Sequence, residues 1–159
     1  MNTNFKHQHM KHLIAFSFLI TLFACSKDQF YSKRLMKGET WTVQSIKIND
    51  TLSEISGAWE ITQDVNIYDS VPQAVWQENT NDAIFQWQFH EKAKKFYINY
   101  QVLCEECEPN TLDTLDNFAN ALSGEYDAID LSRKKMSFSS KTTKGFNGKK
   151  VEIVIEKKD

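Results

Sequence analysis

The sequence is poor in proline, glycine and histidine, and each shortage excludes a class of protein. Two prolines and five glycines in 159 residues exclude a collagen-like or low-complexity chain. Three of the four histidines lie within the first twelve residues, so His90 is the only one in the rest of the chain. A Ser-His-Asp or Cys-His catalytic arrangement would have to use it. Because His90 falls on the polar face of a predicted strand, we expect an exposed histidine and no enzyme.

Other signatures of chemistry are also missing from the sequence. It has no glycine-rich phosphate loop, no nucleophile elbow and no loop with regular calcium-ligand spacing. Carboxylate pairs must occur among 21 acidic residues, but none is marked by its surroundings. We therefore expect no cofactor.

Two features at the start of the chain indicate export. Residues 1–12 are polar and basic, and Leu13–Ala24 is a run of 12 uncharged, mostly apolar residues. This length suits the core of a signal peptide and is too short for a bilayer, which needs about 20 residues. Residues 1–24 are therefore interpreted as a signal peptide that is removed.

The end of this run resembles the lipobox of bacterial lipoproteins. Leu22-Phe23-Ala24-Cys25 has an aliphatic residue at −3, a small residue at −1 and then cysteine. The resemblance implies that Cys25 carries lipid, which would anchor the protein in a membrane of the cell envelope. Ser26-Lys27-Asp28 looks like the charged tag that sends lipoproteins of the Bacteroidetes to the cell surface. Residues 25–37 are interpreted as the lipidated cysteine and a short polar tether with a helical turn.

Residues 38–159 follow the period-two pattern of β-strands. The clearest example is Ala83–His90, where Phe85, Trp87 and Phe89 share one face. Lys95–Leu103 returns with Phe96, Ile98 and Tyr100 inward, which predicts an antiparallel hairpin. Other strands are predicted at Trp41–Ile48 (with a bulge near Gln44-Ser45), Ala58–Thr62, Val65–Tyr68, Ala74–Glu78, Tyr126–Leu131, Lys135–Ser140 and Lys149–Glu156.

One stretch has helical spacing instead. Leu115, Phe118, Ala119 and Leu122 follow i, i+3, i+4, i+7, which predicts a short helix. Eight or nine antiparallel strands and one short helix predict a mostly all-β domain, either an up-and-down β-barrel of about eight strands or a two-sheet β-sandwich.

The charge is distributed unevenly along the predicted mature chain. Residues 25–131 carry eight basic and 18 acidic residues, whereas residues 132–159 carry nine basic and three acidic ones. The basic end would suit anionic head groups or an acidic partner, or it solvates the outer faces of edge strands. An exported, acidic chain without a recognition motif excludes nucleic acid as a partner.

The segment Leu35-Met36-Lys37-Gly38-Glu39-Thr40-Trp41 resembles the opening of a lipocalin-type barrel. The lipocalin-like (calycin-type) lipoproteins of the Bacteroidetes share this layout of signal peptide, lipidated cysteine, tether and barrel. The resemblance implies a barrel end formed by Gly38 and Trp41, and binding in place of catalysis. The side chains that would line a ligand cavity, or else fill the interior, are Trp59, Trp76, Phe85, Trp87, Phe89, Phe96 and Tyr100.

Cys104 and Cys107 are the only thiols left once Cys25 is lipidated. In an oxidising compartment they form a disulfide by default. A metal site is the other interpretation, although a structural zinc site needs four ligands and a second Cys-x-x-Cys is missing. Glu105 and Glu106 raise the pKa of a neighbouring thiol, which excludes redox catalysis.

Two functions remain open at this point. The first is a membrane-anchored, non-catalytic module that binds a small apolar ligand inside a lipocalin-like barrel. The second is an accessory envelope lipoprotein with a filled barrel, which docks a protein partner through the acidic Cys104–Asp116 segment or the basic C-terminal hairpin.

Overall fold

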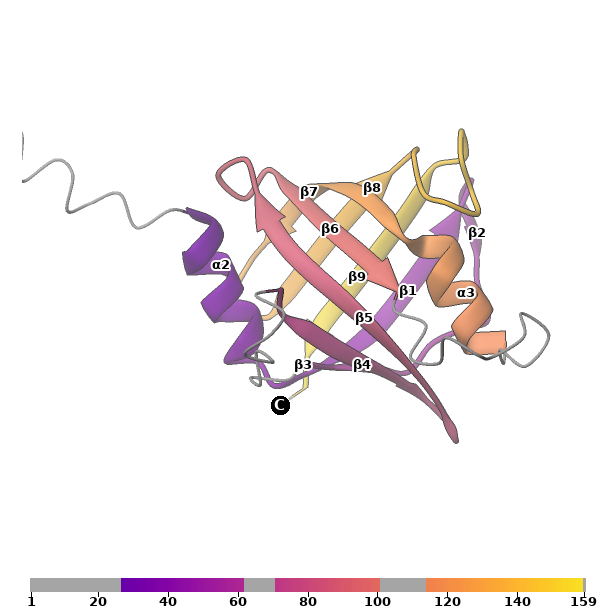
Figure 1. The fold of residues 1–159 in the computed structure, drawn as a ribbon, viewed down its shortest axis with the longest axis horizontal. Coiled ribbons are helices and arrows are strands. Elements are labelled where there is room, and N and C mark those ends of the chain that lie inside the picture. The colour runs from indigo at the N-terminus through magenta and orange to yellow at the C-terminus, as the bar shows by residue number, and fades with distance from the viewer. Residues whose placement is uncertain (1–26, 62–70, 101–113, 159) are drawn as a thin grey trace, which may run out of the picture.

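The computed structural model describes residues 27–61, 71–100 and 114–158. These ranges hold nine strands and two helices (Figure 1). The elements are α2 (Lys27–Met36), β1 (Thr40–Ile48), β2 (Thr51–Leu52), β3 (Ala58–Ile61), β4 (Gln73–Glu78), β5 (Asn81–His90), β6 (Lys95–Tyr100), α3 (Thr114–Leu122), β7 (Gly124–Leu131), β8 (Lys135–Ser140) and β9 (Val151–Lys157). The strand predicted at Val65–Tyr68 lies outside the described residues.

Eight of these strands form a closed antiparallel barrel. The order runs β1-β3-β4-β5-β6-β7-β8-β9, and β9 pairs with β1 to close the ring. The short strand β2 extends β1 as a hairpin on its other side. Because β1 and β9 are hydrogen-bonded along their length, the fold is the lipocalin-like up-and-down barrel, and the alternative of a two-sheet sandwich is wrong.

Local chemistry explains the turns of this barrel. Asn49 and Asp50 join β1 to β2 with φ values of 47° and 64°, as a type I′ hairpin turn requires. The predicted bulge in β1 is confirmed, because the register with β9 shifts between Val43 and Ser45. The shift keeps Ile46 inside with Trp41 and Val43, although strict alternation would turn it outward.

The predicted faces of the central hairpin are confirmed. Phe85, Trp87 and Phe89 of β5 and Phe96 and Ile98 of β6 are all buried. The turn between them, residues 91–94, begins with three consecutive residues of positive φ. The turn between β4 and β5 is only two residues long, Asn79 and Thr80, because β5 already begins at Asn81.

The two helices close the two ends of the barrel, as Figure 1 shows with α2 in indigo and α3 in orange. The predicted helix around Leu115 is confirmed as α3, with Leu115, Ala119 and Leu122 buried. At the other end, α2 runs for ten residues where the sequence predicted only a helical turn in a tether. Its apolar pattern is weak because Leu35 is its only fully buried side chain. The described residues between 27 and 158 therefore form the closed barrel, the two end helices and a hydrophobic core inside the barrel.

Candidate functional site

Aromatic side chains fill the interior of the barrel. All seven side chains predicted to line a cavity or fill the core are at most 9% exposed. In one cluster the ring centroids of Trp59 and Phe85 are 5.0 Å apart, and those of Trp59 and Trp76 are 6.1 Å apart. In a second cluster Phe96 stacks on Phe138 at 4.3 Å. Such contacts add packing energy beyond area burial, so these side chains support one another.

The space left between the side chains of the first cluster is very small. A cavity of about 10 Å³ is bounded by Trp59, Trp76, Phe85, Ile98, Ala119 and Leu122. This volume is at the lower limit for a single water molecule. Of the predicted cavity-lining residues, the structure brings Trp59, Trp76 and Phe85 around this space. Trp87, Phe89 and Phe96 lie in the second cluster with Phe138.

Gly38 and Trp41, the predicted barrel end, are in direct contact beside the C-terminal end of α2. The Trp41 indole Nε1–H donates to the Leu35 carbonyl at 2.9 Å, and Trp41 is fully buried. A Cβ added to Gly38 would lie 2.1 Å from Trp41 Nε1. Because Gly38 has no side chain, the Trp41 indole can pack directly against the backbone at the C-terminal end of α2.

Three of the four indoles in the core have a hydrogen-bond acceptor. Besides Trp41, Trp76 donates to the Ser56 carbonyl at 2.6 Å and Trp87 to the Gln73 carbonyl at 3.2 Å. The Trp59 N–H is buried and finds no partner in the described part of the chain. Because an unpaired buried donor is costly, Trp59 is a weak point in the core, and the buried Thr143 hydroxyl also lacks a partner among the described residues.

His90 lies in a small network of charges on the outer face of β5, β6 and β7. Its Nε2 is 3.4 Å from Glu125 Oε2, and its side chain is 34% exposed. Lys95 Nζ contacts Asp127 at 2.9 Å and Glu125 at 3.2 Å. Hydrogen bonds to Asp127 and then to Glu125 raise the pKa of Lys95. These paired surface charges are what the polar face of a strand normally carries.

The three cysteines lie outside the described residues, so the predicted lipidation of Cys25 and the disulfide or metal site at Cys104 and Cys107 stay predictions. Among the residues that are described, no group of three or more His, Cys, Asp or Glu side chains could hold a metal ion. Within the same ranges, no helix has the length and apolar character needed to span a membrane.

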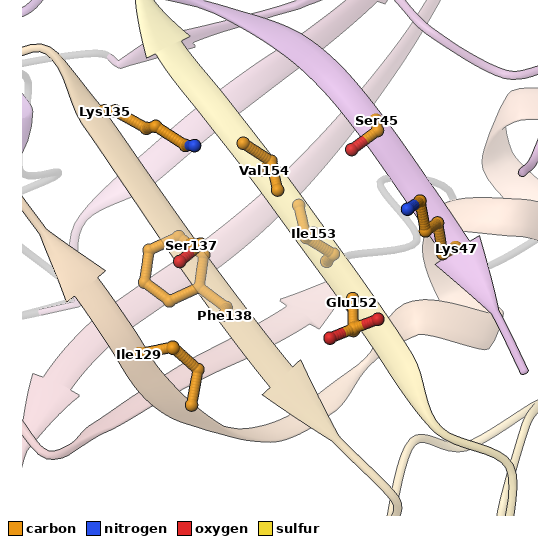
Figure 2. Close-up of a pocket in the computed structure, with 9 residues that line it drawn as sticks. All are labelled: Ser45, Lys47, Ile129, Lys135, Ser137, Phe138, Glu152, Ile153 and Val154. Atoms are coloured by element: carbon orange, nitrogen blue, oxygen red, sulfur yellow. The ribbon is translucent and has the colours of Figure 1, made fainter. Parts of the chain in front are cut away.

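Sequence reasoning missed a groove on the outer face of the barrel. The groove has a volume of about 200 Å³ and crosses four neighbouring strands, β7, β8, β9 and β1 (Figure 2). We call it the hairpin groove, because β8 and β9 form its floor. Its lining residues are Ser45, Lys47, Ile129, Lys135, Ser137, Phe138, Glu152, Ile153 and Val154.

The apolar end of the hairpin groove is produced by a bulge in β7. The register between β7 and β8 shifts between Ala128 and Asp130, so that Ile129 has no partner on β8. A bulge redirects the side chain of the extra residue, and Ile129 is 67% exposed as a result. Nothing in the sequence marks this position, since a bulge depends on the register of two strands.

A second hollow lies at the end of the barrel that α2 covers. Its volume is about 950 Å³, and seven of its nine lining residues are lysine or arginine. The residues come from α2 and the turn that follows it, from the turn between β7 and β8, and from the end of β9. The basic composition of residues 132–159 was visible in the sequence, but the addition of Lys33 and Arg34 from α2 and of Lys37 just after it was not.

The chain was also compared with known proteins. No protein-family model, no curated protein and no solved structure matches it.

Proposed function

We propose that the protein is a lipid-anchored, non-catalytic accessory protein of the bacterial cell envelope, whose filled barrel serves as a rigid body for docking a protein partner. The single observation that carries the proposal is the filled interior. The two aromatic clusters occupy the volume that a lipocalin-like barrel would offer to a ligand, and about 10 Å³ remains between the described side chains of the first.

The filled interior favours this function over the binding of a small apolar ligand. An eight-stranded barrel either holds one small ligand or is filled by its own side chains. Ligand pockets usually have volumes of about 300–1,000 Å³, so ligand entry would require several core rings to move together. Displacing Trp59 or Phe96, each at most 1% exposed, would cost about 3–5 kcal/mol per ring, judged from the effect of truncation.

The hairpin groove is the surface that we assign to the partner. Its lining combines an exposed apolar residue, Ile129, with three charged residues, Lys47, Lys135 and Glu152 (Figure 2). A mixed apolar and charged patch is typical of interfaces between proteins. All strands around the groove are already paired, so a partner would bind through side chains and not by adding a strand.

Native mass spectrometry of residues 27–159 tests the filled barrel. We expect the native mass to equal the denatured mass, because no ligand is carried inside. A discrete extra mass that disappears on denaturation would overturn the proposal and restore ligand binding.

A second test concerns the anchor: protein extracted from the membrane of the native host should lack residues 1–24 and carry acyl mass on Cys25. A Cys25→Ala variant should carry none.

Site-specific photo-crosslinking in cells tests the docking surface. A crosslinker at Ser137, in the hairpin groove, should yield one discrete adduct in the full-length protein. The adduct should disappear with Ile129→Asp and persist with Leu52→Asp, a matched change at another exposed apolar residue (62% exposed). Loss of the adduct in both variants, or in neither, would contradict docking at this groove.

A further inference from the structure

We infer that the basic hollow at the α2 end of the barrel is a membrane-docking surface that binds the phosphate groups of anionic lipids. The inference rests on the proposed lipid anchor, and it adds an orientation: the α2 end faces the bilayer and the α3 end faces away. We call the hollow the α2 cleft. Its lining residues from α2 and the following turn are Phe30, Lys33, Arg34, Lys37 and Gly38.

Three segments that are distant in sequence bring their basic residues to the α2 cleft. Lys33, Arg34 and Lys37 follow the helical spacing of one face of α2 and its end. Arg133 and Lys134 come from the turn between β7 and β8. Lys157 and Lys158 come from the end of β9.

Hydrogen bonds hold the three segments in place. Arg34 Nη1 donates to the Leu131 carbonyl at 2.7 Å, which fixes α2 against the end of β7. The Lys157 backbone N–H donates to the Lys134 carbonyl at 2.8 Å, and that of Lys158 donates to the Thr40 carbonyl at 3.1 Å. The three segments that carry the cations are therefore held together as one frame.

All the charged side chains that line the α2 cleft are basic. No Asp or Glu among the described residues lines the cleft. Of the carboxylates on the contributing segments, Asp28 accepts the Ala93 N–H and Asp130 accepts the Ser132 N–H, and Glu156 precedes Lys157 in β9. Lysine and arginine clusters of this kind bind phosphate by charge-assisted hydrogen bonds.

The position of the cleft identifies the membrane as the source of the phosphate. Cys25 precedes Lys27, the first residue of α2, by two residues, which allows a separation of at most about 7 Å. Acyl chains on Cys25 would thus hold the start of α2 at the head groups. A ten-residue helix extends only about 15 Å, so the cleft remains close to the same layer. Attraction to an anionic surface amounts to about 1 kcal/mol per nearby Lys or Arg.

An exposed aromatic ring beside these cations also supports a membrane surface as the binding partner of the cleft. Phe30 is 52% exposed and lines the cleft, with the Arg34 guanidinium 4.7 Å from the centre of its ring. A bulky aromatic side chain next to basic residues is typical of elements that lie in the membrane interface. An acidic protein partner would not need this ring.

Vesicle binding of residues 27–159 tests the inference, because this part of the chain contains all eight paired strands of the closed barrel and the core described between them. The probes are vesicles of phosphatidylcholine alone and of phosphatidylcholine mixed with phosphatidylglycerol. We expect stronger partitioning onto the anionic vesicles, weakened by added salt. Lys33→Glu combined with Lys157→Glu should lower that partitioning at least about tenfold.

The matched control is Lys141→Glu combined with Lys149→Glu. Both lysines are exposed in the loop between β8 and β9, which packs on α3 at the opposite end of the barrel through the bond from Gly145 N–H to the Ala121 carbonyl. The net charge change is identical, and we expect partitioning to change less than about twofold. Equal loss in both double variants, or equal binding of the original protein to both vesicles, would overturn the inference. Because the domain used here lacks Cys25, failure of this test is distinguishable from failure of the anchor.

Discussion

The four core tryptophans share an apolar environment but differ in whether the indole N–H has a hydrogen-bond acceptor. Trp41, Trp76 and Trp87 each donate to a backbone carbonyl, whereas Trp59 has no acceptor in the described part of the chain. A paired hydrogen bond contributes about 1 kcal/mol, and an unpaired buried donor costs about 1–3 kcal/mol. The same substitution should therefore have different effects at these positions.

We expect Trp41→Phe to lower the free energy of unfolding by at least about 1 kcal/mol more than Trp59→Phe, because only the former breaks a hydrogen bond and the latter removes an unsatisfied donor. Urea denaturation of both variants gives the comparison. Equal losses would mean that Trp59 has a partner, such as a bound water molecule.

Gly38 and Trp41 are coupled by direct steric contact. Gly38→Ala should destabilise the domain by about 1–3 kcal/mol, because the new Cβ would lie 2.1 Å from Trp41 Nε1. The loss should be smaller when Trp41 is already phenylalanine, since the smaller ring relieves the clash. A double-mutant cycle by urea denaturation measures this coupling, and strictly additive losses would contradict it.

At the scale of elements, each end of the barrel depends on contacts between a helix and a strand. At the α3 end, Tyr126 of β7 is fully buried, and its hydroxyl donates to the Leu122 carbonyl at 2.6 Å. This bond covers one of the last carbonyls of α3, which have no partner within the helix. Burial raises the pKa of Tyr126 far above its ordinary value of 10.0.

The raised pKa of Tyr126 predicts a loss of stability in alkali. Above pH 10 the unfolded chain releases the Tyr126 proton while the folded chain retains it, so the folded state binds more protons and stability falls as pH rises. The stabilisation is complete below pH 10 and decreases by up to about 1.4 kcal/mol per pH unit above it.

Tyr126→Phe should remove this component of the alkaline slope, as measured by urea denaturation between pH 9 and pH 11. The hydroxyl itself contributes about 1 kcal/mol at neutral pH. Tyr97→Phe, on the exposed face of β6, is the control and should keep the Tyr126 component. An unchanged slope in Tyr126→Phe would show that the phenol is accessible in the native state.

At the scale of the whole molecule, the filled interior predicts how the barrel responds to truncation. Phe96 and Phe138 stack at 4.3 Å and are at most 1% exposed. Phe96→Ala should cost about 3–5 kcal/mol and leave a dry cavity. Small apolar compounds such as benzene should then raise the melting temperature of the variant but not that of the original protein. Stabilisation of the original protein by such compounds would argue for a ligand cavity.

How far the sequence predicts this fold depends on the element. Strict alternation in β5 and β6 identified both strands and their buried faces, because period two leaves no other way to bury three aromatic rings. The helical spacing of α3 was equally clear. By contrast, α2 buries only Leu35 fully, and the two-residue strand β2 is too short for any pattern. Both follow from contacts with the barrel.

The sequence by itself determined the class of the protein: an alternating, aromatic-rich chain with few glycines and prolines can bury its rings only as an antiparallel β-domain. The tertiary structure decided the rest. The pairing of β9 with β1 closed the sheet, and the fit of the rings left about 10 Å³ among the described side chains of the first cluster. The β7 bulge exposed Ile129, and three distant segments met at the α2 cleft. These features depend on strand register and on contacts between residues about 100 positions apart, such as Arg34 with Leu131, and local patterns carry no information about such contacts.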